Sequence, residues 1–216
     1  MCGARRKILV NNAGVTVAGP IDSELVDESA LDRQLAINYT SVVAAIRAAF
    51  PLLPDGGRIV SISSGVGTRV GFPGMTDYAG AKSALEGYSR GAARDLAHRG
   101  ITVNVIQPGF IDTEMNPADG SAAPMFLPTT ATGRYGRPEE IAAGVVFLAG
   151  PQASYVTGAV LRIDGDTAHS AATRPTASGH GRRRRTSEVS PTGRTPPDLA
   201  SQTPAARVHN LTGNYT

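Results

Sequence analysis

The sequence predicts an α/β fold in which helices cover a parallel β-sheet. Short apolar runs of the kind that form buried strands alternate along residues 1–166 with longer stretches whose apolar residues recur at helical spacing. Strands that alternate with helices form parallel sheets through right-handed crossover connections. In such sheets the ligand site lies beyond the carboxyl ends of the strands, so a site is expected in the loops that begin at Asn11, Ser63 and Gln107.

Four short runs rich in β-branched residues are the predicted strands. They occupy residues 8–10, 59–62, 103–106 and 160–163. The first three lead directly into loop residues, and the first ends at the turn-prone sequence Asn11-Asn12-Ala13-Gly14.

Three helices are predicted between and after these strands. The first covers residues 31–50, where apolar residues recur at helical spacing, and it ends at Pro51. The second covers residues 78–98, with Asp77 as its N-cap. The third covers residues 138–148 and has proline at its first position, where no backbone N–H is needed.

Residues 167–216 differ in composition from the rest of the chain. Many are Thr, Ser, Pro, Ala and Arg, and the few Leu, Ile or Val residues are Val189, Leu199, Val208 and Leu211. So few apolar side chains cannot offset the entropy lost on ordering. We therefore expect a domain at residues 1–166 followed by a disordered tail rich in Arg, Pro and Thr.

The basic character of the chain belongs to this tail. The formal net charge is +3 and the pI is 9.3, but residues 167–216 hold 7 Arg against 2 acidic residues. The remaining part is slightly acidic and gives no reason to expect nucleic acid as a partner. The arginine run at residues 182–185 is interpreted as a solvated cluster, with a nucleic-acid site as the alternative.

Several other classes of protein are not expected. A single cysteine, Cys2, excludes a disulfide framework within the chain, and the four dispersed histidines suggest no metal site. We find no apolar run near 18 residues and no secretory start, so we expect a cytoplasmic protein without a membrane partner.

Tyr78 and Lys82 are the first candidates for chemistry. Lysine occurs only at positions 7 and 82, and Lys82 follows Tyr78 by four residues. On a helix these two positions share a face, so an ammonium would lie beside a phenol and lower its pKa toward the range of a general acid or base. The alternative is an exposed tyrosine packed along a lysine stem.

Ser63, Ser64 and Asn38 are candidates because of where they fall. The two serines follow a predicted strand, where a sheet delivers side chains to a site, although serine is also a common turn residue. Asn38 lies inside a predicted helix although asparagine is a poor helix former, and its amide needs partners. In the alternative interpretation, neighbouring backbone supplies those partners.

Several motifs occur in an order and at a spacing that match those of a known protein family. They are Asn11-Asn12-Ala13-Gly14, Asn38, Ser64, Tyr78-Ala79-Gly80-Ala81-Lys82, Pro108-Gly109-Phe110-Ile111-Asp112-Thr113, Gly136-Arg137-Pro138-Glu139-Glu140, Tyr155-Val156-Thr157-Gly158 and Ile163-Asp164-Gly165. Residues 7–166 thereby resemble the short-chain dehydrogenase/reductase family, and within it 3-oxoacyl-carrier-protein reductases and a branch that includes a cyclic-di-GMP-binding biofilm dispersal mediator. The resemblance implies the second half of a Rossmann-like, doubly wound parallel sheet.

The resemblance also implies a carbonyl reductase that uses NADP or NAD. Tyr78 would donate a proton to the carbonyl oxygen, to which Ser64 would hydrogen-bond, with Ser63 as the alternative serine. Lys82 would lower the pKa of Tyr78 and bind the ribose of the cofactor, and Asn38 would hold a water that links Lys82 to solvent. The other residues implied to line the cofactor are Asn12, Ala13, Gly14, Pro108, Gly109, Ile111 and Thr113.

The same resemblance bears on the partners. A small carbonyl compound would be the substrate, covered by residues 116–135, where Met125, Phe126 and Leu127, with Met115 just before, line an apolar pocket or cap the core. The helices that carry Asn38 and Tyr78 would pack against a second copy of the chain in a homodimer or homotetramer, although packing within one chain explains their small residues almost as well.

One expected feature of the family is missing from the sequence. Ahead of residue 8 there is no glycine-rich turn of the Gly-x-x-x-Gly-x-Gly kind, whose backbone N–H groups hold the cofactor pyrophosphate. Two hypotheses follow: a truncated reductase whose catalytic half is intact, or a non-catalytic fragment or nucleotide-binding regulatory module. For the 216-residue polypeptide we expect weak or no turnover of NADPH.

Overall fold

The computed structural model describes residues 7–24 and 26–167. Thr167, the first residue of the predicted tail, belongs to the folded part, because it pairs with Thr130 and is only 4% exposed. The rest of that tail lies outside the described residues.

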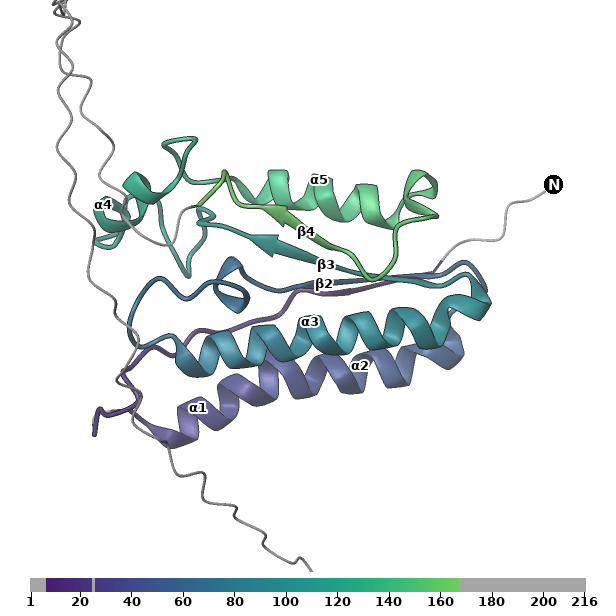
Figure 1. Cartoon of the computed structure of the whole chain (residues 1–216), viewed down its shortest axis with the longest axis horizontal. Helices are drawn as coiled ribbons and strands as arrows, with labels where there is room; N and C mark the ends of the chain where they lie inside the picture. Colours follow the sequence, from purple (N-terminus) through teal and green to yellow (C-terminus); the bar gives the residue numbers. More distant parts are fainter. Residues whose placement is uncertain (1–6, 25, 168–216) are drawn as a thin grey trace, which may run out of the picture. The chain divides into compact units, whose positions relative to one another are not determined.

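Four parallel strands form the sheet in this part of the chain (Figure 1). They are β1 (Ile8–Asn11), β2 (Arg58–Ile62), β3 (Thr102–Pro108) and β4 (Val160–Ile163), in the order β1-β2-β3-β4. Each coincides within two residues with a strand expected from the sequence. The predicted α/β class with a Rossmann-like parallel sheet is therefore confirmed.

The register of the sheet brings the loops that follow β1, β2 and β3 to the same end of the sheet. Asn11 pairs with Ser61, Ile62 with Ile106, and Pro108 with Ile163, so the strands end side by side. The three loops in which the site is expected begin at these strand ends.

Helices cover both faces of the sheet (Figure 1). On one side lie α1 (Glu28–Leu35), α2 (Ser41–Ala49) and α3 (Thr76–Leu96), and on the other lies α5 (Pro138–Ala149). A short α4 (Ala123–Phe126) precedes α5. The single-turn helices are Phe50–Leu52, Gly65–Gly67, Ala97–Arg99, Leu127–Thr129 and Pro151–Ala153.

Two helix predictions need correction. The helix expected at residues 31–50 is interrupted by a π-helical turn, Ala36–Thr40, that separates α1 from α2 and contains Asn38. Asp77 does not cap α3, which begins at Thr76, two residues earlier than predicted, with Met75 at the N-cap position. Its carboxylate instead lies in the first turn, where the helix dipole favours negative charge.

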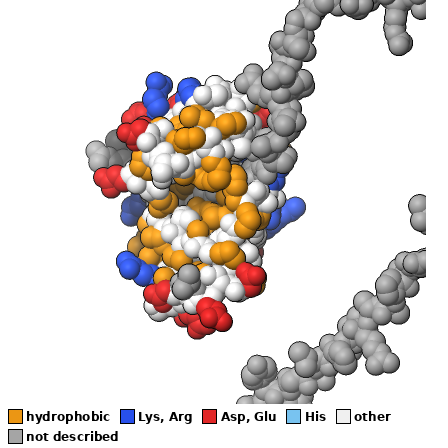
Figure 2. Space-filling model, turned by 90° about the vertical axis from the view of Figure 1, so that its left-hand side faces the viewer, with side chains coloured by type: hydrophobic (Ala, Val, Ile, Leu, Met, Phe, Trp, Pro, Cys, Tyr) orange, Lys and Arg blue, Asp and Glu red, His pale blue; other side chains and the backbone are white. Residues whose placement is uncertain are grey.

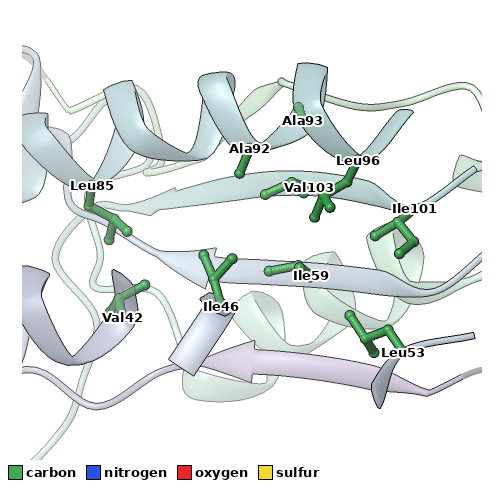
Figure 3. Packing of buried hydrophobic residues seen from close by; sticks show 10 residues of the cluster. All are labelled: Val42, Ile46, Leu53, Ile59, Leu85, Ala92, Ala93, Leu96, Ile101 and Val103. Atoms are coloured by element: carbon green, nitrogen blue, oxygen red, sulfur yellow. The ribbon is translucent and has the colours of Figure 1, made fainter. Parts of the chain in front are cut away.

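The main core lies between the sheet and the helices α2 and α3 (Figure 3). Alanines on α3, such as Ala92 and Ala93, allow that helix to approach the sheet closely, and Leu85 and Leu96 fill the remaining space. A second cluster lies between the sheet and α5 and consists of Val60, Ile106, Leu148 and Ala153. Ile59 and Val60 are both 0% exposed, so β2 is buried on both faces, as is usual in a parallel sheet.

The strand β1 is less covered than β2 and β3. Ile8 is 49% exposed and Val10 is 41% exposed. In the described residues β1 forms one edge of the sheet, with β2 as its only neighbour.

One helical stretch is apolar enough to meet the length and composition of a membrane span, contrary to the sequence expectation. Glu28–Leu52 contains an 18-residue window with a mean hydropathy of 1.4. Val42 and Ile46 from this stretch belong to the main core, although only 17% of the window is buried. A single stretch of this kind in the described part of the chain is weak support for a span.

Candidate active site

Tyr78 and Lys82 lie next to each other near the start of α3. The Nζ atom of Lys82 is 5.7 Å from the centroid of the Tyr78 ring. Lys82 is 3% exposed, whereas Tyr78 is partly buried. The helical spacing thus places the phenol and the ammonium on one face, as the sequence predicts.

The hydroxyl of Tyr78 forms hydrogen bonds with the side chains of Ser64 and Thr16. Burial raises the pKa of Tyr78 above its ordinary value, and the two hydrogen bonds offset part of that rise. The net pKa of this phenol is therefore raised and not lowered, because burial disfavours the phenolate more than its surroundings stabilise it. The contribution of Lys82 to this pKa stays a prediction.

Lys82 directs its ammonium to the end of β2. Its Nζ donates a hydrogen bond to the carbonyl oxygen of Ile62 at 3.1 Å. Burial lowers the pKa of Lys82 to about 8. An ammonium has three N–H donors, and Ile62 uses one of them, so Lys82 retains donors for a polyhydroxyl group in front of the strand ends.

The structure distinguishes the two serines. Ser64 faces Tyr78 and also accepts a hydrogen bond from the backbone N–H of Val66 at 3.3 Å. Ser63 turns the other way, 3% exposed, and donates to Oε1 of Glu86 at 2.8 Å. Only Ser64 is in a position to share a ligand oxygen with Tyr78.

Asn38 is completely buried and holds the loop that follows β1. Its Oδ1 accepts a hydrogen bond from the N–H of Val15 at 3.1 Å, and its Nδ2 donates to the carbonyl oxygen of Val15 at 2.8 Å. This is the alternative interpretation, in which backbone supplies the partners of the amide. The described contacts of the Asn38 side chain are structural, and a bound water at this residue stays a prediction.

Gly14 lies where Asn38 and Lys82 converge. A Cβ atom added to Gly14 would lie 3.1 Å from Oδ1 of Asn38 and 3.4 Å from Nζ of Lys82. The backbone of this loop therefore approaches both side chains closely. Asn12 and Ala13, directly before Gly14, are exposed at the end of β1.

The loop after β3 supplies the remaining predicted cofactor contacts. Pro108 ends β3, and Gly109 donates its N–H to the carbonyl oxygen of Ile163 at 3.1 Å. A Cβ on Gly109 would lie 2.7 Å from Cα of Asp164, so the close approach requires glycine. Ile111 pairs with Gly136, and Thr113 pairs with Asn116.

An aromatic cluster lies beside this loop. Phe110 stacks on Phe126 with ring centroids 4.3 Å apart, and Phe72 meets Phe126 edge-on at 5.2 Å. Phe126 therefore packs among aromatic rings, whereas Met115 and Met125 are 59% and 56% exposed. Figure 2 looks onto the carboxyl ends of the strands and shows apolar side chains on both sides of a hollow.

Three residues near this site are not among those predicted from the sequence. Thr16 bonds with Tyr78 but carries no signal in the sequence. Glu86 and Gln107 are 3% and 2% exposed and form a buried network with Ser63. The spacing of Tyr78, Lys82 and Glu86, four residues apart on one helix face, could have indicated Glu86. No group of three or more His, Cys, Asp or Glu side chains suited to a metal ion occurs among residues 7–24 and 26–167.

Comparison with known proteins identifies the family of this fold. A family model described as "Enoyl-(Acyl carrier protein) reductase" matches residues 4–166. The chain belongs to the short-chain dehydrogenase/reductase family.

Two relatives show how similar the chain is to other members. It is 48% identical over 158 residues to the "Cyclic-di-GMP-binding biofilm dispersal mediator protein" of Escherichia coli (strain K12), a match that covers 73% of this chain and 66% of the relative. It is 41% identical over 169 residues to the "3-oxoacyl-[acyl-carrier-protein] reductase FabG" of Vibrio harveyi, covering 76% of this chain and 67% of the relative. The chain thus spans about two thirds of the length of these relatives.

Solved structures of similar proteins match about the same share of the chain. The blue fluorescent protein from a metagenomic library in complex with NADPH matches with a TM-score of 0.72 and 48% identity, over 74% of this chain and 64% of that chain. BdcA in complex with NADPH matches with a TM-score of 0.72 and 46% identity, over 74% of this chain and 65% of that chain.

Proposed function

We propose that this chain carries the carbonyl-reducing site of an NADP(H)-dependent oxidoreductase. The observation that carries the proposal is the Tyr78 hydroxyl bonded to Ser64 at the strand ends, with the buried ammonium of Lys82 beside the tyrosine ring. A phenol and a serine hydroxyl that lie side by side can both donate hydrogen bonds to one carbonyl oxygen as negative charge develops on it.

The residues at this edge fit the nicotinamide end of the cofactor, which would supply a hydride. Lys82 retains N–H donors for ribose hydroxyls, and Gly14 lets the loop backbone approach without a side chain in the way. Asn12 and Ala13 would line the same surface, and Pro108, Gly109, Ile111 and Thr113 would border it from the loop after β3. We propose NADP(H) and not NAD(H) as the cofactor, because these similar solved structures are complexes with NADPH.

The raised pKa of Tyr78 is suited to reduction. A phenol that burial keeps protonated at neutral pH can donate its proton to the carbonyl oxygen when a hydride reaches the carbonyl carbon. Ser64 would hold that oxygen in place through its own hydroxyl. Lys82, with a pKa of about 8, is mostly charged at pH 7 and would stabilise the phenolate that remains.

The substrate class that fits best is a 3-oxoacyl compound or a similar small ketone. The 3-oxoacyl reductase relative supports a carbonyl beside an acyl chain. The exposed apolar side chains of Met115 and Met125 offer a surface for such a chain.

The test is reduction of an acetoacetyl thioester or a simple diketone, followed by loss of NADPH absorbance. The assay uses high NADPH and protein concentrations. Tyr78→Phe should lower the rate by about 100-fold or more, since it removes the proton donor. Tyr88→Phe is the matched control, because Tyr88 lies on the same helix and packs against Tyr39. Equal rates for wild type and Tyr78→Phe would contradict the proposal.

A second candidate function is nucleotide binding without catalysis. The observation that favours it is the 48% identity to a relative whose name describes cyclic-di-GMP binding. Calorimetric titration with cyclic-di-GMP distinguishes the two candidates. Binding that is unchanged in Tyr78→Phe, together with no reduction of any carbonyl tested, would favour the binding module over the reductase.

We further propose a cytoplasmic homo-oligomer that assembles through the outer face of α2 and α3. Phe50 is 43% exposed there, beside a pocket of about 350 Å³ between the two helices. Sedimentation velocity tests this proposal: Phe50→Glu should shift the chain to monomer, whereas Val70→Glu, at an exposed position in the loop before α3, should not. A wild-type chain that sediments as a monomer would contradict it.

A further inference from the structure

A buried network of polar side chains lies directly behind the candidate active site. Glu86, Gln107 and Ser63 are 3%, 2% and 3% exposed. Oε1 of Glu86 accepts hydrogen bonds from Oγ of Ser63 at 2.8 Å and from Nε2 of Gln107 at 2.6 Å. A single carboxylate oxygen thus connects the end of β2, the helix α3 and the end of β3.

The members of this network are adjacent in sequence to proposed site residues. Ser63 precedes Ser64, and Gln107 precedes Pro108, which opens the proposed cofactor loop. Glu86 follows Tyr78 and Lys82 at successive spacings of four residues, so all three lie on one face of α3. Ser63 also donates to the carbonyl oxygen of Lys82 at 3.3 Å.

The loop that carries Ser64 is attached to the same network. Nε2 of Gln107 donates its second N–H to Oγ1 of Thr68 at 2.7 Å, so both hydrogens of that amide are used. A Cβ on Gly67 would lie 3.1 Å from Oε1 of Glu86 and 3.3 Å from the carbonyl carbon of Lys82. Ser83 donates to the carbonyl oxygen of Gly67. The turn after Ser64 is therefore fixed against α3 around Glu86.

We propose that Glu86 is a positioning residue that sets the distance between Ser64 and Tyr78. It touches neither of them and acts through Ser63 and Gln107. Its carboxylate is carried by α3 and accepts hydrogen bonds from Ser63, directly after β2, and from Gln107 in β3. This proposal rests on the proposed function for its effect on rate, but its effect on the Tyr78–Ser64 contact is independent of any reaction.

The decisive comparison is between Glu86→Met and Glu86→Gln. Methionine has a similar shape but offers no strong acceptor, so Ser63 and Gln107 lose their common partner. Glutamine keeps one carbonyl oxygen that can accept both hydrogen bonds. Ser89→Ala is the matched control, because Ser89 is 1% exposed on the same helix and its Oγ has no hydrogen-bond partner in the described part of the chain.

The first readout is the titration of Tyr78 without cofactor, followed by NMR of ¹³Cζ-labelled tyrosine and assigned with Tyr78→Phe. In Glu86→Met we expect Ser64 to move away from Tyr78, so the pKa of Tyr78 should rise above its wild-type value. Glu86→Gln and Ser89→Ala should titrate like the wild type. An unchanged Tyr78 titration in folded Glu86→Met would overturn the proposal.

The second readout is the carbonyl-reduction rate. Glu86→Met should lower kcat about 10- to 100-fold with little change in KM for the carbonyl compound, and Glu86→Gln should restore kcat to within about threefold. A rise in KM alone would overturn the proposal. If Glu86→Met does not fold, Gln107→Met removes the same contact from β3 and should give the same two changes. A rate that does not depend on Tyr78 would defeat the proposed function, while the titration would still decide the role of Glu86.

Discussion

The ammonium of Lys82 donates to the carbonyl oxygen of Ile62 at 3.1 Å, at a position where Lys82 is 3% exposed. Among the described side chains, Lys82 has no carboxylate in salt-bridge contact, and burial is the cause of its lowered pKa of about 8. A charge held in this way is unfavourable for folding and is typical of a group retained for function.

Replacing Lys82 should therefore stabilise the fold while removing the proposed activity. Below about pH 8 the lysine is charged in both the folded and unfolded states, so the folded state carries the full penalty of burial. Lys82→Met should raise the free energy of unfolding at pH 7 by up to about 3 kcal/mol. Between pH 8 and the unfolded value of 10.5 the wild type loses its proton first in the folded state, so the difference should shrink. Urea unfolding at pH 7, 9 and 10 measures it, and a variant less stable than wild type at pH 7 would show that burial is not the dominant effect.

The hydroxyl of Thr16 should influence the titration of Tyr78. Its hydrogen bond lowers the pKa of Tyr78 against the larger effect of burial, so Thr16→Val should raise that pKa further. Absorbance of the phenolate, taken as a difference from the same variant carrying Tyr78→Phe, follows this group alone. Thr132→Val, at an exposed threonine that contacts the backbone of Arg134, should leave the titration unchanged. The same titration curve in Thr16→Val and wild type would refute the contact.

Gly109 and Gly87 should respond in opposite directions to alanine. A Cβ on Gly109 would lie 2.7 Å from backbone atoms of Asp164, so Gly109→Ala should destabilise the fold by about 1–3 kcal/mol. Gly87 lies inside α3 with nothing within 4 Å of an added Cβ, so Gly87→Ala should stabilise the fold by about 1 kcal/mol. Thermal unfolding of the two variants tests the pair, and a neutral Gly109→Ala would mean that the loop after β3 is not closely packed on Asp164.

Asn38 should contribute to stability whether or not the chain is an enzyme. Asn38→Leu keeps a similar volume but removes two hydrogen bonds to Val15 at a site that is 0% exposed. We expect a loss of about 2–3 kcal/mol in the free energy of unfolding, because the N–H and C=O of Val15 lose their partner. Chemical unfolding measures the loss. A change below about 0.5 kcal/mol would mean that water replaces the amide and that the loop after β1 does not depend on it.

The fold could be predicted from the sequence because its signals are local. Runs such as residues 103–106 are rich in apolar, β-branched side chains, and loop residues or proline end most elements, so strands and helices alternate visibly. The Tyr78–Lys82 pair was also predictable, since helical spacing alone places the two side chains together. The π-helical turn around Asn38 was not, because no local pattern reports it, and Asn38 within it bonds with Val15, 23 residues earlier.

Electrostatics was harder to predict than geometry. The spacing of Tyr78 and Lys82 suggested a lowered phenol pKa, but the sign depends on how deeply the ring is buried, which no local pattern reports. The choice between Ser63 and Ser64 depended likewise on Glu86, which reaches the strand end from α3. Thr16 reaches Tyr78 from a loop 62 positions away in sequence and leaves no pattern.

Transfer of deuterium tests the central claim most directly. The purified 216-residue chain is incubated with NADPH deuterated at the reactive carbon and with a diketone, and the alcohol is analysed by mass spectrometry. The proposed site predicts an alcohol that carries one deuterium at the former carbonyl carbon, formed by wild type and Tyr88→Phe and nearly absent with Tyr78→Phe or Ser64→Ala. An equal yield of deuterated alcohol from wild type and Tyr78→Phe would contradict it.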